Sequence, residues 1–134
     1  MDTASLIALL ENNSARVREM LVHLDLDAEV STCPGWNVRD LIHHLSCTQR
    51  WATDSVADAK THKHWMDLGN YDQPTDDDLV GWFTEGANRL ADTLNDAPDD
   101  LDCWTFMSDI ESPLHFWTRR QAHETAVHRV DVEV

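Results

Sequence analysis

The amino-acid sequence predicts an all-α protein built as a four-helix bundle. Four stretches repeat apolar residues at steps of three and four, which is the pattern of a helix that buries one face. Only four glycines and four prolines interrupt the 134 residues, and 42% of the residues are hydrophobic. With this length and composition we expect a single domain, residues 1–134, around one hydrophobic core.

The first helix is expected to run to about Leu24. Its apolar positions begin near Leu6 and continue through Val17 at helical spacing. Either Asp2 or Thr3 can cap its start, because a short polar side chain accepts hydrogen bonds from the free backbone N–H groups of the first turn.

The second helix is expected between Asn37, which can act as its cap, and about Ala59. A loop that contains Pro34 and Gly35 precedes it. Its apolar face is formed by Val38, Leu41, Ile42 and Leu45. Residues 60–74 show no helical period, so we expect a loop there.

The third helix is expected to begin at Thr75, because the three aspartates at 76–78 favour the positive end of a helix dipole. Its apolar positions are Leu79, Phe83, Ala87, Leu90 and Leu94. A polar connection leads to Pro113, a residue favoured in the first turn of a helix. The fourth helix is therefore expected over about 114–132.

The charge of the chain excludes several partners. Lys and Arg total 10 against 25 Asp and Glu, which gives a formal net charge of -15 and opposes binding to nucleic acid or anionic lipid. There is no run of about 18 apolar residues, and the N-terminus lacks the basic start of a signal peptide, so a cytoplasmic protein is expected. Cys33, Cys47 and Cys103 form no C-x-x-C pair and are expected to be reduced and structural.

The stretch H-E-T-A-V-H at 123–128 carries the first candidate metal ligands. His123 and His128 are five residues apart, about 140° around a helix, so they cannot form the two-histidine site of an H-E-x-x-H peptidase. Glu124 and His128 are four apart and share a face, which suits zinc or another divalent metal if another helix supplies a further ligand. A surface hydrogen-bonded pair is the alternative. His123 falls in line with Val127 and Val130, which predicts a structural histidine on the packing face.

Two adjacent histidines in the second helix can supply the further ligand. The apolar face of that helix lies closer to His44 than to His43 when each residue turns the helix by about 100°. His44 is therefore the better inward candidate. Trp51 lies seven residues further along, almost in line with His44, and could wall the same pocket.

Two segments together identify a resemblance. The sequences C-P-G-W-N-V-R-D-L-I-H-H-L-S and F-W-T-R-R-Q-A-H-E-T-A-V-H-R-V-D-V-E resemble the N-terminal domain of the mycothiol-dependent maleylpyruvate isomerase family. That family is part of the DinB-like group of metal-binding four-helix bundles. The resemblance implies zinc, or another divalent metal, bound by His44, Glu124 and His128.

The resemblance also implies an activity. Mycothiol, a small thiol of actinobacteria, would reach the open metal position, where a divalent cation lowers the pKa of a thiol. Attack of the thiolate on an electrophilic substrate, followed by elimination, would make a cis–trans isomerase, and attack without elimination would make an S-transferase. A metal-dependent hydrolase of the same fold and a non-enzymatic acidic interaction domain are the alternatives.

Other residues are candidates for the cofactor and substrate. Arg119 and Arg120, one turn before Glu124, could hold an anionic substrate or thiol, or could instead pair with nearby acids. The candidate pocket walls are Trp36, Trp51 and Trp117. Members of the family usually continue into a C-terminal domain, so this chain is expected to be the N-terminal part of a longer protein or to work as a homodimer.

Overall fold

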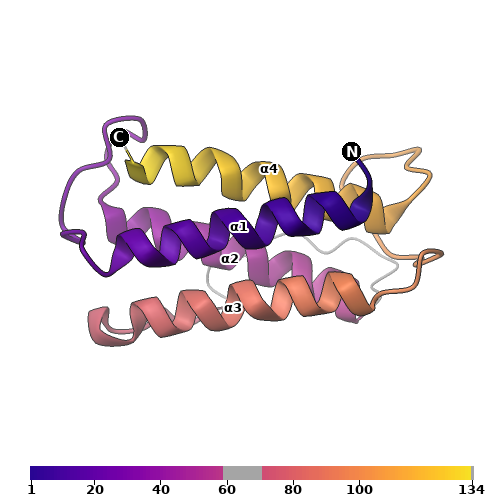
Figure 1. The fold of residues 1–134 in the computed structure, drawn as a ribbon, viewed down its shortest axis with the longest axis horizontal. Coiled ribbons are helices and arrows are strands. Elements are labelled where there is room, and N and C mark those ends of the chain that lie inside the picture. Colours follow the sequence, from indigo (N-terminus) through magenta and orange to yellow (C-terminus); the bar gives the residue numbers. More distant parts are fainter. Residues whose placement is uncertain (59–70, 134) are drawn as a thin grey trace.

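The computed structural model describes residues 1–58 and 71–133, and it confirms the all-α, DinB-like four-helix bundle (Figure 1). Its helices are α1 Thr3–Leu21, α2 Val38–Ala57, α3 Asp76–Asp96 and α4 Pro113–Glu133. Among the described residues, no helix combines the length and the apolar character needed to cross a membrane.

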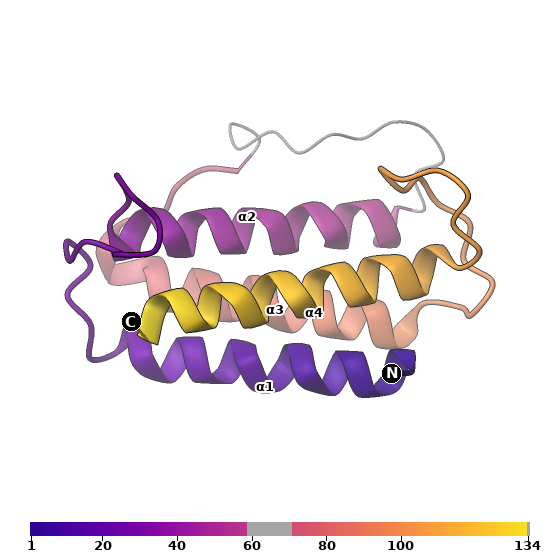
Figure 2. The ribbon, with the colours of Figure 1, turned by 90° about the horizontal axis from the view of Figure 1, so that it is seen from above.

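The helices are arranged so that the start of α2 lies near the end of α4. In Figures 1 and 2, α1 and α4 run in one direction, and α2 and α3 run in the other. Helix α4 packs against both α1 and α2, and α3 completes the ring by packing against the same two helices. Because α2 and α4 are antiparallel neighbours, side chains in the first turns of α2 meet side chains in the last turns of α4.

The caps explain where the helices begin. The Asp2 carboxylate accepts a hydrogen bond from the Ser5 N–H at 2.7 Å. Asn37 and Asp40 form a reciprocal capping box, in which each side chain accepts from the other's backbone N–H, at 2.8 and 3.1 Å. Thr75 takes the predicted N-cap position of α3, but its side chain makes no hydrogen bond to the backbone.

One predicted helix end differs from the structure, and another lies outside the described residues. Helix α1 ends at Leu21 and not at Leu24. Val22 is 67% exposed, and His23 donates its N–H to the carbonyl of Met20 in a tighter turn, so the apolar run continues after the helix has ended. The predicted end of α2 near Ala59, and most of the predicted loop, lie outside the described residues.

The buried apolar side chains form two clusters instead of the one expected core. One cluster joins the start of α1 and α4 to the end of α2 and α3, and the other lies at the opposite end of the bundle. A buried polar contact lies between them: the Gln49 amide donates to the Thr125 hydroxyl at 3.1 Å and to the Ser14 hydroxyl at 3.4 Å. The interface of α2 and α4 is therefore polar between the two apolar clusters.

Candidate metal centre

The three predicted ligands meet between α2 and α4. The Oε1 atom of Glu124 lies 3.4 Å from Nε2 of His44 and 3.1 Å from Nε2 of His128. One ligand atom from each residue falls within a set whose members are all within 4.8 Å of one another. The three side chains are only 13% to 22% exposed, so they form a shielded cluster rather than a surface network.

The structure also separates His44 from His43. The His43 ring stacks on Trp82, with centroids 5.5 Å apart and an angle of 12° between the rings. Its Nε2 lies 3.7 Å from the sulfur of Cys47. Burial lowers the pKa of His43, which favours a neutral ring beside Trp82. Of the two adjacent histidines, only His44 faces Glu124, as the helical rotation predicts.

The electrostatics of the cluster favour an ionised carboxylate. Hydrogen bonds with His128, and then with His44, hold the pKa of Glu124 far below its ordinary value, although burial opposes the shift. The pKa of His128 is raised, first by its hydrogen bond with Glu124 and, against burial, by Asp131 as well. At neutral pH, Glu124 therefore presents a negative charge between two imidazole rings.

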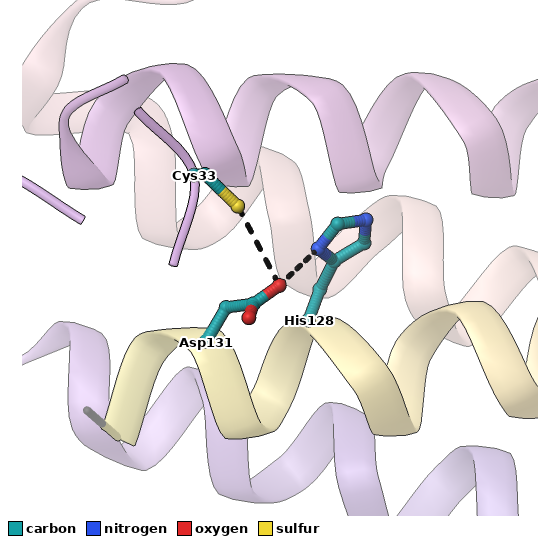
Figure 3. A group of neighbouring side chains, drawn as sticks. All are labelled: Cys33, His128 and Asp131. Carbon is teal, nitrogen blue, oxygen red and sulfur yellow. Dashed lines mark hydrogen bonds and ion pairs between the residues drawn. The ribbon is translucent and has the colours of Figure 1, made fainter. Parts of the chain in front are cut away.

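Asp131 is a site residue that sequence reasoning missed. Its Oδ2 atom lies 2.9 Å from Nδ1 of His128 (Figure 3). The same carboxylate accepts a hydrogen bond from the Thr32 hydroxyl at 2.7 Å and one from the Cys33 thiol at 3.6 Å. Burial raises the pKa of Asp131, but the hydrogen bonds from Thr32 and His128 outweigh it and lower the pKa. The spacing of three between His128 and Asp131 was visible in the sequence; the contact with the loop was not.

The side chains present fit a divalent metal. Two imidazole nitrogens and one carboxylate oxygen form a donor set that zinc accepts in catalytic sites, where a fourth position stays open. The contact of Asp131 with Nδ1 leaves Nε2 of His128 directed at Glu124, as a second carboxylate typically does for a ligating histidine. Asp131 thus contacts one member of the donor set without belonging to that set.

Comparison with known families identifies a match to nearly the whole chain. The family model described as Mycothiol maleylpyruvate isomerase N-terminal domain matches residues 7–133. The chain belongs to this family. The match includes both segments that meet at the cluster, and it indicates a mycothiol-related, DinB-like domain. No curated protein and no solved structure matched the chain.

In this family member, the three candidate tryptophans occupy two different places. Trp36 lies against His44, with ring centroids 5.0 Å apart. Trp51 and Trp117 instead contact each other edge to face at 5.0 Å, about 10 Å further along α2 from the level of His44. There they belong to an aromatic cluster that also contains Trp104, Phe106 and Phe116. Trp36 is therefore the tryptophan that adjoins the candidate ligands.

The two arginines lie beside a surface pocket of about 540 Å³. Arg119 and Arg120 are exposed and line this pocket together with Phe106 and Phe116. The guanidinium of Arg120 also lies 3.3 Å from Oε2 of Glu124 and 5.7 Å from the Phe106 ring. Arg120 thus connects the pocket with the candidate ligands and also makes the acid pair expected as the alternative.

The prediction for His123 was wrong. His123 is exposed and lines the same pocket, so it is not a histidine of the packing face. The neighbours that suggested burial, Val127 and Val130, are 58% and 46% exposed. The buried face of α4 instead carries polar residues such as Gln121 and Thr125, which an apolar pattern does not reveal.

Proposed function

We propose that this domain binds a divalent metal, zinc by its donor set, through His44, Glu124 and His128, and that it serves a mycothiol-dependent isomerase or S-transferase reaction. The observation that carries the proposal is the meeting of these three ligand atoms within 4.8 Å between two helices. Membership of a mycothiol-related family supports the choice of thiol.

The chemistry needs a thiolate at neutral pH. A divalent cation supplies it by lowering the pKa of a thiol that reaches it. The protein's own part is to hold an anionic oxygen, Glu124, between two imidazole nitrogens and to limit the access of water. Trp36 lies against the ring of His44. The side chains of His44 and Glu124 are mostly buried but keep a small exposed surface that a small molecule could reach.

The substrate in this proposal is an anionic electrophile. Arg119 and Arg120 would attract it against the acidic field of the protein, and Phe106 and Phe116 offer an apolar wall for its carbon skeleton. Trp51 stacks on Phe106 with centroids 5.8 Å apart, and Trp117 packs against Phe116. These two tryptophans would therefore support the pocket from behind.

The proposal also covers what completes the substrate site and the compartment in which the protein works. The family description names an N-terminal domain, so we propose that a C-terminal domain or a second copy of the chain completes the substrate site. The three free cysteines suit a reducing compartment, which supports the cytoplasm.

Metal analysis tests the ligand set. Protein purified without chelator should hold about one metal ion per chain, and His44→Ala, Glu124→Ala and His128→Ala should each lose most of it. His43→Ala is the matched control, because it removes the adjacent imidazole, which stacks on Trp82. Full metal retention in all three ligand variants would exclude the site.

Cobalt substitution tests the thiol. Adding mycothiol, or a substitute thiol, to the cobalt protein should produce a sulfur-to-cobalt charge-transfer band, because the thiolate enters the open position. The same experiment in Cys33→Ser protein ensures that the sulfur is not the protein's own. An intact cobalt site without any change would favour an acidic interaction domain. Turnover of an ester or amide without thiol would favour a hydrolase.

A further inference from the structure

The loop that carries the C-P-G-W sequence contacts the candidate metal centre through Asp131. We propose that Asp131 is a positioning residue for His128 and that Thr32 and Cys33 hold Asp131 in place, so that the loop clamps a metal ligand from its outer side. This inference rests on the proposed metal site and assigns a role to three residues outside the proposed ligand set.

The contact between Asp131 and His128 fixes which ring nitrogen is free. The Oδ2 atom of Asp131 lies 2.9 Å from Nδ1, and both side chains are only 13% exposed (Figure 3). A carboxylate accepts but does not donate, so in the neutral ring the proton stays on Nδ1 and the lone pair stays on Nε2. Nε2 is the atom that faces Glu124, at 3.1 Å.

Two donors from the loop hold the carboxylate. The Thr32 hydroxyl donates to Oδ1 of Asp131 at 2.7 Å, and the Cys33 thiol lies 3.6 Å from Oδ2. Oδ2 thus faces both the thiol and the imidazole, as Figure 3 shows, while Oδ1 is occupied by the hydroxyl. With Thr32 and Cys33 in place, Asp131 has little freedom to turn away from His128.

The loop is itself held in one shape by backbone hydrogen bonds. The N–H of Val30 donates to the carbonyl of Trp36 at 2.9 Å, and the N–H of Trp36 donates to the carbonyl of Cys33 at 3.1 Å. Between them Gly35 has a φ of 85°, a conformation that side-chain-bearing residues rarely adopt. One small, closed loop therefore places Cys33 on Asp131 and Trp36 on His44.

A second metal site is the competing interpretation, because Cys33, Asp131 and His128 also offer three close ligand atoms. The chemistry of His128 favours the clamp. Because Nε2 of His128 is the atom assigned to the proposed metal site, a second metal on Nδ1 would require the ring to lose both N–H protons.

Zinc affinity, measured by competition with a chromophoric chelator, tests the clamp. Asp131→Ala should weaken zinc binding by about 10- to 100-fold, the range typical for loss of a carboxylate behind a ligating histidine. Asp131→Asn keeps the shape without the charge and should fall between this variant and the wild type. Cys33→Ala should cost less than Asp131→Ala, and Cys33→Ser, which keeps a donor, should recover most of the loss.

Glu133→Gln is the matched control. It removes a carboxylate two residues further along α4, where the partners are Arg16 and Arg129, so zinc affinity should not change. A readout specific to positioning is the Nδ1 proton of His128 in nitrogen-15 spectra of zinc-loaded protein. This proton should be protected from exchange in the wild type and lose that protection in Asp131→Ala.

The outcomes separate the clamp from the metal site. Failure of the wild type to bind zinc would overturn both. Normal zinc binding in the wild type, with equal affinity and an unchanged Nδ1 signal in Asp131→Ala, would overturn the clamp alone. Two zinc ions per chain, falling to one in Cys33→Ala, would also overturn it, because the thiol would then be a ligand and not a donor to Asp131.

Discussion

The α2–α4 interface contains two clusters of different composition. At one end, Trp51 and Trp117 join a cluster of rings that is stabilised by the apolar area it buries. At the other end, His44, Glu124 and His128 bring titratable groups together, where burial alone opposes the charged forms. The first arrangement needs no ligand to be stable. In the proposed function a cation joins the second arrangement, so the aromatic cluster and the proposed metal site lie at different levels of the same pair of helices.

Truncating the central ring of the aromatic end is expected to have the largest effect. Trp117 has no exposed surface, and its indole N–H donates to the carbonyl of Trp104 at 3.0 Å. Trp117→Ala should lower the free energy of unfolding by about 3–5 kcal/mol, since it leaves a cavity and removes this hydrogen bond. Urea unfolding of metal-free protein measures this change.

The same variant tests whether the two ends are independent. Its zinc affinity should stay within about threefold of the wild type, because Trp117 lies about 10 Å before Glu124 along α4. If Trp117→Ala does not fold, Trp117→Phe gives a smaller cavity for the same comparison. A loss of zinc affinity as large as that of a ligand variant would show that the two ends form one unit.

Zinc itself should stabilise the protein by the next largest amount. At a free zinc concentration 100 times the dissociation constant, the free energy of unfolding should rise by about 2.7 kcal/mol, since zinc favours the folded chain. Glu124→Ala should lose this increment, while Trp117→Ala should keep it. Unfolding curves with zinc and with a chelator give the difference, and an equal increment in Glu124→Ala would contradict the proposed ligand set.

The pH dependence of the stability of the metal-free protein tests the Glu124–His128 pair. The expected effect is smaller than that of zinc. The pKa of Glu124 is lowered, so its contribution to stability is fully present above the ordinary value of 4.5 and is lost as the pH falls through the acid range. The pKa of His128 is raised, so its contribution is fully present below 6.5 and is lost as the pH rises through the raised pKa. The contribution of the pair should therefore be largest between about pH 4.5 and 6.5.

Glu124→Gln should lower this maximum, because it removes the shift at Glu124 and the largest cause of the shift at His128, while Asp131 still raises the pKa of His128. Urea unfolding of the two proteins across this range, with a chelator present, measures the difference. Parallel curves for the wild type and Glu124→Gln would mean that the pair is not formed in solution.

Helical geometry and the family resemblance together predicted the three residues of the candidate site. A turn of 100° per residue is enough to prefer His44 over His43 and to pair Glu124 with His128, and the structure brings these three residues together. The Asn37 cap was equally predictable, because it depends on residues three positions apart. Which residues share a face of one helix can be predicted without knowing how the rest of the chain folds.

Features that depend on the packing of separate segments were missed. The bond from Thr32 to Asp131 requires the loop to close onto the last turn of α4, which no periodicity contains. The error at His123 arose because valines on the outer face of α4 suggested burial, while Gln121 and Thr125 occupy the inner face. The division of the core into two clusters has the same cause, since buried polar residues break the expected apolar pattern.

The border between the two ends can be placed by a substitution of small expected effect. Gln121 is 1% exposed, and none of the described residues donates a hydrogen bond to its Oε1 atom. Gln121→Leu should raise the free energy of unfolding by about 1 kcal/mol, since it removes a buried acceptor that has no partner.

Gln49→Leu is the contrasting control. It should destabilise the protein, because the Gln49 amide donates to two hydroxyls, even though its own Oε1 atom also has no donor among the described residues. A stabilised Gln121→Leu protein with normal zinc affinity would place Gln121 with the aromatic end, whereas a loss of zinc affinity would extend the metal centre one turn further along α4.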